Sequence, residues 1–244
     1  MWPSNLTANP AKPPVSIVTP TYNRNKFIPA LIECIKDQTY PKERIEWLVY
    51  DDSNTPVWEL LLPYEKELNI RYFRSETKLT IGEKRNKLNE EARGTYIVTM
   101  DDDDYYFPQR VSSAVQALVS HKMDIAGCSR NQLYFTDDAS IWHVGPYGVY
   151  HATFGTMAYS KKYANAHKCD ETVAFAEEIK FTNRYTEPLL QLNPDTVMLV
   201  MCHKENTFNK SKLRTDGNPS FKKTDLKLDD ILKNPKLRDF YKSV

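Results

Sequence analysis

Residues 15–24, VSIVTPTYNR, and residues 45–54, IEWLVYDDSN, decide the fold of this 244-residue chain. Each stretch opens with a short apolar, β-branched run that predicts a buried strand, and each ends abruptly in polar residues. Between them, apolar residues recur at helical spacing from Phe27 to Ile35, and Asn25 is placed to cap that helix. A strand, a helix and a second strand at this spacing predict a βαβ unit with parallel strands.

The same pattern continues to residue 104. Further strands are expected at 70–73 and 95–100, and Thr80 and Glu83 form a T-x-x-E capping box for a helix that runs to about Ala92. We therefore predict an α/β fold in which residues 15–104 form a Rossmann-like, mostly parallel sheet flanked by helices.

The second half of the chain has a different pattern. After a helix at about 109–120, alternating apolar and polar residues at 131–136 and 150–159 predict more exposed, antiparallel or mixed strands. A helix is expected to begin near Glu177 and to continue through Tyr185, and a strong strand is expected at 196–202. Residues 105–208 are thus expected to form a smaller part with a mixed sheet.

The two ends of the chain differ from this central unit. Residues 1–14 are rich in proline and small polar residues, which is typical of a flexible leader or linker, and residues 209–244 are interpreted as a C-terminal helical tail. Residues 15–208 are expected to form a single compact domain.

Composition excludes several classes of protein. With 33 basic and 32 acidic residues the net charge is +1, whereas nucleic-acid-binding proteins usually have a clear basic excess. The four cysteines form no C-x-x-C pair, which favours a reducing compartment over a disulfide framework. No apolar run is long enough to cross a bilayer, and the first residues lack the pattern of a secretory signal. The expected location is the cytoplasm.

Polar clusters follow three of the expected strands, at 19–22, 51–53 and 101–104. Ligands bind at the carboxyl ends of strands in open parallel sheets, so these clusters predict one site for a base, a ribose and a metal. Four adjacent aspartates at a buried strand end require a compensating cation, and their hard oxygens suit Mg²⁺ or Mn²⁺ together with substrate phosphates. The alternative is a solvated acidic turn.

With these motifs in order, the sequence resembles the family 2 glycosyltransferases, which have the GT-A fold. Besides the two opening stretches, GEKRNKL (82–88), MDDDDYYFPQRV (100–111), AEEIKFTNR (176–184) and HKENTF (203–208) match that family's pattern. The resemblance covers about residues 15–208. It implies metal-assisted, inverting transfer of a sugar, expected to be a hexose, from a UDP-sugar to a hydroxyl of a carbohydrate acceptor.

The resemblance also implies a donor site. Backbone around Pro20 and the ring of Tyr22 would hold uracil, and Asp52 would accept from the ring N–H unless it only forms a turn. Arg85 would face the donor, the alternative being a solvated helix charge, and Asp101 would contact the ribose or a metal-bound water. The full implied donor set is Pro20, Tyr22, Asp52, Arg85, Asp101 and Asp102.

Asp103 is the implied metal ligand, as the second acid of D-x-D, with His203 as a second ligand or a structural residue. Glu178 is the implied general base, in a Glu177-Glu178 pair where the family usually has Glu-Asp. The dipole of the expected helix would lower the pKa of Glu178 and keep it ionised. Asp104 is expected to orient a neighbour. The tentative acceptor set is Trp142, Tyr150, His151 and Glu177, for each of which core packing is the alternative to sugar contact.

Two other functions remain open at this point. A nucleotidyltransferase could use the aspartates but would have no evident use for Glu178. A non-catalytic module that binds nucleotide sugars or carbohydrate, within a larger multidomain enzyme, is also compatible with the linker-like leader.

Overall fold

The computed structural model describes residues 12–206, 208, 210–214 and 218–244. Residues 1–11 of the expected leader therefore lie outside the described residues. The first of two sheets has the strand order β10-β6-β9-β4-β1-β2-β3. Its strands are β1 (Val15–Thr21), β2 (Ile45–Asp51), β3 (Ile70–Arg74), β4 (Tyr96–Thr99), β6 (Ile125–Gly127), β9 (Ala158–Ser160) and β10 (Leu190–Gln191).

Strands β1 to β4 are parallel, as the sequence predicts, with Val15 opposite Ile45 in the register of β1 and β2. Strand β9 runs antiparallel to both of its neighbours, β4 and β6. Ile17 and Val18 are adjacent in β1 but belong to separate apolar clusters, because successive strand residues point to opposite faces. Both faces of the sheet are therefore buried, which explains the uninterrupted apolar runs.

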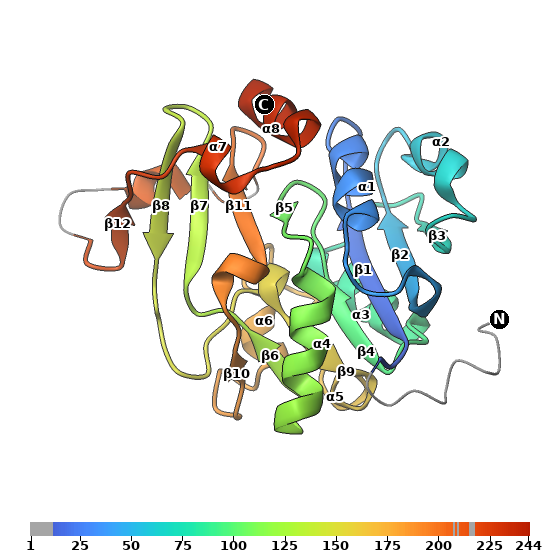
Figure 1. The fold of residues 1–244 in the computed structure, drawn as a ribbon. Coiled ribbons are helices and arrows are strands. Elements are labelled where there is room, and N and C mark those ends of the chain that lie inside the picture. Colours follow the sequence, from blue (N-terminus) through green and yellow to red (C-terminus); the bar gives the residue numbers. More distant parts are fainter. Residues whose placement is uncertain (1–11, 207, 209, 215–217) are drawn as a thin grey trace.

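Helices cover both faces of this sheet (Figure 1). The helices are α1 (Ile28–Lys36), α2 (Trp58–Leu61), α3 (Ile81–Glu91), α4 (Arg110–His121), α5 (Lys161–Ala166), α6 (Glu178–Phe181), α7 (Leu228–Ile231) and α8 (Pro235–Ser243). The capping box of α3 is confirmed, since Glu83 N donates to Thr80 Oγ1 at 3.2 Å and Thr80 N donates to Glu83 Oε2 at 2.7 Å. Asn25 as a cap is wrong: Phe27 occupies that position without a side-chain cap, and the Asn25 amide bonds to Thr55 O instead.

The second sheet has five strands in the order β12-β8-β7-β11-β5 and is mixed, as expected. Its strands are β5 (Tyr105–Tyr106), β7 (Asn131–Phe135), β8 (Ser140–Val144), β11 (Met198–Cys202) and β12 (Phe221–Lys223). Strands β7 and β11 are parallel, and every other pair in this sheet is antiparallel.

Two predictions for the second half are wrong. The stretch 150–159 is not a strand. A 3₁₀ turn forms at Phe154–Thr156, and only the last two residues of the stretch belong to β9. The helix expected near Glu177 lasts a single turn and ends at Phe181, because Asn183, Arg184 and Tyr185 all have positive φ angles (46°, 58° and 58°). Three successive residues in this region cannot continue a right-handed helix.

The C-terminal segment packs into the same core as β1. Four of its side chains are nearly inaccessible to solvent: Leu228, Leu232, Leu237 and Tyr241. Phe240 of α8 packs edge-on against Phe27, beside α1, and the Tyr241 hydroxyl donates to Asp104 O at 2.8 Å. Within the described parts of the chain, no helix combines the length and apolar character needed to cross a membrane.

Candidate functional site

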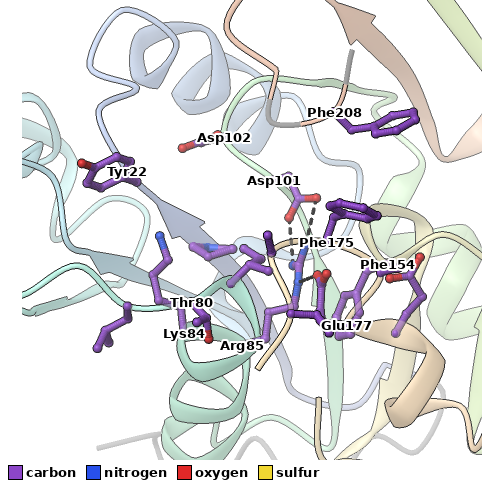
Figure 2. A pocket seen from close by; sticks show the side chains of 18 of the residues that line it. Tyr22, Thr80, Lys84, Arg85, Asp101, Asp102, Phe154, Phe175, Glu177 and Phe208 are labelled. Atoms are coloured by element: carbon purple, nitrogen blue, oxygen red, sulfur yellow. Dashed lines mark hydrogen bonds and ion pairs between the residues drawn. The ribbon is translucent and has the colours of Figure 1, made fainter. Parts of the chain in front are cut away.

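A cavity of about 750 Å³ lies at the carboxyl ends of β1 and β4 and beside the first turn of α3. Figure 2 shows Tyr22, Lys84, Arg85, Asp101 and Glu177 around this space. The polar ends of separate strands meet here, as the sequence predicts for an open parallel sheet. Its lining also includes Pro20, Arg24, Asp102 to Asp104, Phe154, Gly155, Thr172 to Ala176, Glu178, Asn206, Phe208 and Lys210.

Asp52 lies just behind this lining, and Lys84 separates it from the cavity. Lys84 Nζ donates to Asp52 Oδ1 at 2.7 Å and to Thr21 O at 3.0 Å, and Leu79 N donates to Asp52 Oδ2 at 2.7 Å. Lys84 was not among the expected site residues. The GEKRNKL stretch could have indicated it, because the capping box fixes which residues form the first turn of α3 and Lys84 is one of them.

Arg85 joins two parts of the site. Its Nε donates to Glu177 Oε1 at 2.7 Å, and its two terminal nitrogens donate to the two oxygens of Asp101 at 2.9 and 3.2 Å (Figure 2). Its guanidinium also lies 4.1 Å from the centre of the Phe154 ring. Burial alone would lower the pKa of Arg85, but the charges of Asp101 and Glu177 hold it well above its usual range. Arg85 is only 5% exposed, so the alternative of a solvated helix charge is wrong.

The acidic run is largely buried and each member has a different environment. Asp102 and Asp104 are both 7% exposed, so the alternative of a solvated turn is wrong. Burial and the neighbouring charge of Asp103 raise the pKa of both carboxyls well above their usual range. Asp104 Oδ1 accepts from Met201 N at 2.8 Å, which links the run to β11.

Asp103 faces the loop that follows β11. Its Oδ2 lies 3.2 Å from His203 Nε2, 3.3 Å from Asn206 Nδ2 and 3.5 Å from Arg24 Nε. Burial alone would raise the pKa of Asp103, but the hydrogen bond and charge of His203 and the charge of Arg24 bring it below its usual value. The expected partners Asp103 and His203 thus meet across 100 residues of sequence.

Asp103 and His203 bring a carboxylate oxygen and an imidazole nitrogen together, and in this structure the two atoms bond directly to each other at 3.2 Å. These donor types suit Mn²⁺ or Mg²⁺ when a substrate supplies further ligands. Within the described residues there is no cluster of three or more His, Cys, Asp or Glu side chains suited to a metal. An ion here would therefore complete its shell with phosphate and water, as Mg²⁺ usually does.

Glu178 lines the cavity from the start of α6, directly after Glu177. Burial and the adjacent Glu177 charge raise the pKa of Glu178 to about 7. The expectation that a helix dipole lowers this pKa is wrong, because a single turn has almost no dipole and burial dominates. Glu177 is buried and its carboxylate bonds to Arg85.

The structure does not place the other three expected acceptor residues in the lining of this cavity. Trp142 packs against Phe135 in the second sheet, and its indole donates to Ser140 Oγ at 2.9 Å. Tyr150 is exposed, and the His151 ring packs at a tilt against Tyr185 with ring centres 4.7 Å apart. Their contact with an acceptor stays a prediction.

Three phenylalanines line the cavity, and no sequence pattern predicts them as site residues. Phe154 lies beside Arg85, while Phe175 and Phe208 come from two separate loops with their ring centres 5.9 Å apart (Figure 2). Phe175 is 59% exposed and Phe208 44% exposed. Residues in irregular loops have no periodicity, so only long-range folding brings these rings together.

The sequence matches the model of glycosyl transferase family 2 over residues 16–181. The chain belongs to this family. Among curated proteins it is 30% identical over 112 residues to the poly(ribitol-phosphate) β-N-acetylglucosaminyltransferase TarS of Staphylococcus aureus strain Mu50, an alignment that covers 45% of this chain and 20% of TarS. It is 34% identical over 115 residues to the putative colanic acid biosynthesis glycosyl transferase WcaA of Escherichia coli K12, with 45% and 40% covered.

Solved structures show the same fold. The structure of residues 1–349 of S. aureus TarS with UDP-GlcNAc matches with a TM-score of 0.66 at 20% identity, covering 80% of this chain and 60% of that one. The mannosyltransferase PcManGT of Pyrobaculum calidifontis, in complex with GDP-Man and Mn²⁺, matches with a TM-score of 0.64 at 15% identity, covering 84% and 62%. These matches confirm the expected GT-A fold for this family 2 domain.

Proposed function

We propose that this chain is an inverting glycosyltransferase that moves a hexose from a UDP-sugar to a hydroxyl of a carbohydrate acceptor. One observation carries the proposal. A single cavity is lined both by an acidic run suited to a metal and a diphosphate and by Glu178, which makes no ion pair within the described residues. A metal site and a separate basic carboxylate are the two parts that a metal-assisted, inverting sugar transfer uses.

The nucleotide lies at the β1 end of the cavity. The Tyr22 ring and the backbone at Pro20 line that end, and Lys78 Nζ sits 4.2 Å from the centre of the Tyr22 ring. Asp52 acts there through Lys84, which it holds in place, so that the ammonium group of Lys84 faces the edge of the uracil. Asp101 and Asp102 lie nearer the ribose.

Asp103 and His203 would hold Mn²⁺ or Mg²⁺ at the diphosphate. When bound, the ion supplies Lewis-acid stabilisation of the negative charge on the departing UDP. Arg24 and Lys210 line the cavity close to Asp103 and add positive charge to this end of the site.

Glu178 removes the proton of the acceptor hydroxyl while the oxygen of that hydroxyl attacks the anomeric carbon. The new carbon–oxygen bond forms as the bond to the diphosphate oxygen breaks, and that electron pair leaves with UDP. A single displacement inverts the anomeric centre. With a pKa of about 7, Glu178 is close to the ideal match for a general base at neutral pH.

Arg85 positions this base. It ties Glu177 to Asp101, so the residue before Glu178 is fixed to the strand end that faces the donor. We assign Glu177 to this positioning role as well as to the edge of the acceptor site.

Relatives support the same reaction class, and TarS also suggests a larger protein. The aligned stretch covers 20% of the length of TarS and 40% of WcaA. We propose that it is one domain of a multidomain enzyme that builds a glycan.

A panel of UDP-sugars and GDP-sugars tests this function. With Mn²⁺ or Mg²⁺ present, we expect release of UDP from at least one UDP-sugar, slowly to water and faster with a carbohydrate acceptor. Release of pyrophosphate would indicate a nucleotidyltransferase, and no turnover of any donor would indicate a binding module. Either result would overturn the proposal.

A further inference from the structure

A second cavity, of about 240 Å³, adjoins the first. The two share five lining residues, which form the boundary between them: Asp101, Asp104, Gly155, Phe208 and Lys210. At about 30 Å³ per water molecule, the second cavity has the volume of about eight waters, which suits one sugar ring but not a nucleotide. Its contact with the site of Glu178 makes it a place for a reaction partner rather than a remote void.

The floor of the second cavity is mainly apolar. It is formed by side chains from four of the five strands of the second sheet: Leu133, Val144, Met198, Val200 and Phe221. Asn131 lies on the same face of β7, opposite Val144, and its amide donates to Thr153 Oγ1 at 3.3 Å. Leu133 and Val200 are neighbours in β7 and β11, so a ligand part that rests on this pair is in contact with apolar side chains.

Asp104 gives the cavity one carboxyl oxygen that is open to a ligand. Its Oδ1 accepts from Met201 N, whereas its Oδ2 has no hydrogen bond to the described residues. Asp104 lines both cavities, so a hydroxyl group of a ligand in either one can bond to this oxygen.

Phe208 forms a wall between the two cavities, and Phe175 lies beside it at the first. Figure 2 shows both rings on the same side of Asp101 and Arg85. Exposed aromatic rings at a cavity offer a flat apolar surface, which suits the C–H face of a sugar.

We infer that the second cavity holds the acceptor's terminal sugar, with an exocyclic methyl group of that sugar on Leu133 and Val200 and one of its hydroxyls bonded to Asp104. This inference rests on the proposed function and adds the class of acceptor to it. The methyl group follows from this pair: a hydroxymethyl group in contact with Leu133 and Val200 would give up its hydrogen bonds to water and gain none from these side chains. A 6-deoxyhexose and an N-acetylhexosamine both supply such a methyl group.

Matched acceptors test the inference. A 6-deoxyhexoside is compared with the hexoside of the same configuration, and an N-acetylhexosaminide with its free amine, using the donor that the parent chain hydrolyses. We expect kcat/KM to be about 10- to 100-fold higher for the methyl-bearing member of one pair, the range that an apolar pocket achieves against an added hydroxyl. The pair that shows the preference identifies the source of the methyl group.

Two variants locate the effect. Val200→Thr keeps the shape of the side chain but places a hydroxyl on the floor, so the preference should fall several-fold. Val119→Thr, at a half-buried site on α4 away from both cavities, is the control and should leave the preference unchanged.

Equal kcat/KM within both pairs would overturn the inference, and so would a preference that Val200→Thr does not alter. Donor hydrolysis without acceptor separates the two proposals. If it is absent, the proposed function fails; if it is present without a methyl preference, only this inference fails.

Discussion

Asp103 directs one carboxylate oxygen at three groups, His203, Asn206 and Arg24. Sequence alone predicted that Asp103 and His203 would meet, because the resemblance placed each in a known motif. Arg24 and Asn206 stand in the motifs VSIVTPTYNR and HKENTF, but neither was given a role. A motif marks a stretch of the chain, whereas only the fold shows which of its side chains reach Asp103.

Asp103→Ala is predicted to abolish metal-stimulated turnover and to leave the fold intact, because this side chain at a strand end has little packing role. His203→Ala should weaken the metal effect less, as one ligand among several that include phosphate and water. Calorimetry of UDP binding with and without Mn²⁺ checks both variants. An unchanged affinity of the parent for UDP after treatment with EDTA would contradict the assignment of this pair.

Helix α3 was predicted well and α6 was not, for a physical reason. The start of α3 is set by the local bonds between Thr80 and Glu83, which any reader of the sequence can recognise. The end of α6 is set by residues 183–185 in the left-handed region, and no glycine marks that turn. The expected lowering of the Glu178 pKa was also wrong, because burial by segments far away in the sequence raises this pKa.

Gly82 of α3 gives a test at the scale of elements. A Cβ at this position would lie 1.9 Å from Asp170 O, so the loop that leads to Glu178 could not keep its place against α3. Alanine normally stabilises a helix interior by about 1 kcal/mol relative to glycine. Here we predict that Gly82→Ala instead destabilises the protein by about 1–3 kcal/mol and lowers the transfer rate.

The control for this prediction is Gly148→Ala, because a Cβ at Gly148 would meet only His151 Cβ, at an ordinary 3.7 Å. Urea unfolding and kcat are measured for both variants. A Gly82→Ala protein with parental or greater stability and parental kcat would show that the loop does not depend on close contact with α3.

At the scale of the whole molecule, the first half could be derived from sequence and much of the second could not. The pairing of β1 and β2 follows from one short βαβ unit. By contrast, β7 pairs with β11, so Gln132 lies opposite Leu199 from a distant part of the chain. Sequence patterns predict strands but not which distant strand each one pairs with. The strand β8, which lies between β7 and β11 in the sequence, was not predicted at all.

The C-terminal segment is predicted to be required for stability. Each fully buried large side chain contributes about 1.5–3 kcal/mol, so losing Leu228, Leu232, Leu237 and Tyr241 would remove about 6–12 kcal/mol, comparable with the whole stability of a domain. A chain ending at residue 227 should therefore lose cooperative unfolding in urea. A parental urea midpoint after this truncation would mean that the segment is an independent appendage.

The transfer rate of the parent and of Glu178→Gln as a function of pH tests the central claim most directly. A general base must be deprotonated, so the parental rate should rise with pH through a midpoint of about 7 and level off above it. Glu178→Gln should transfer about 10²–10⁴-fold more slowly, without that rise, while its UDP affinity stays within a few-fold of the parent. A Glu178→Gln protein that transfers sugar at the parental rate with the same pH profile would contradict the account.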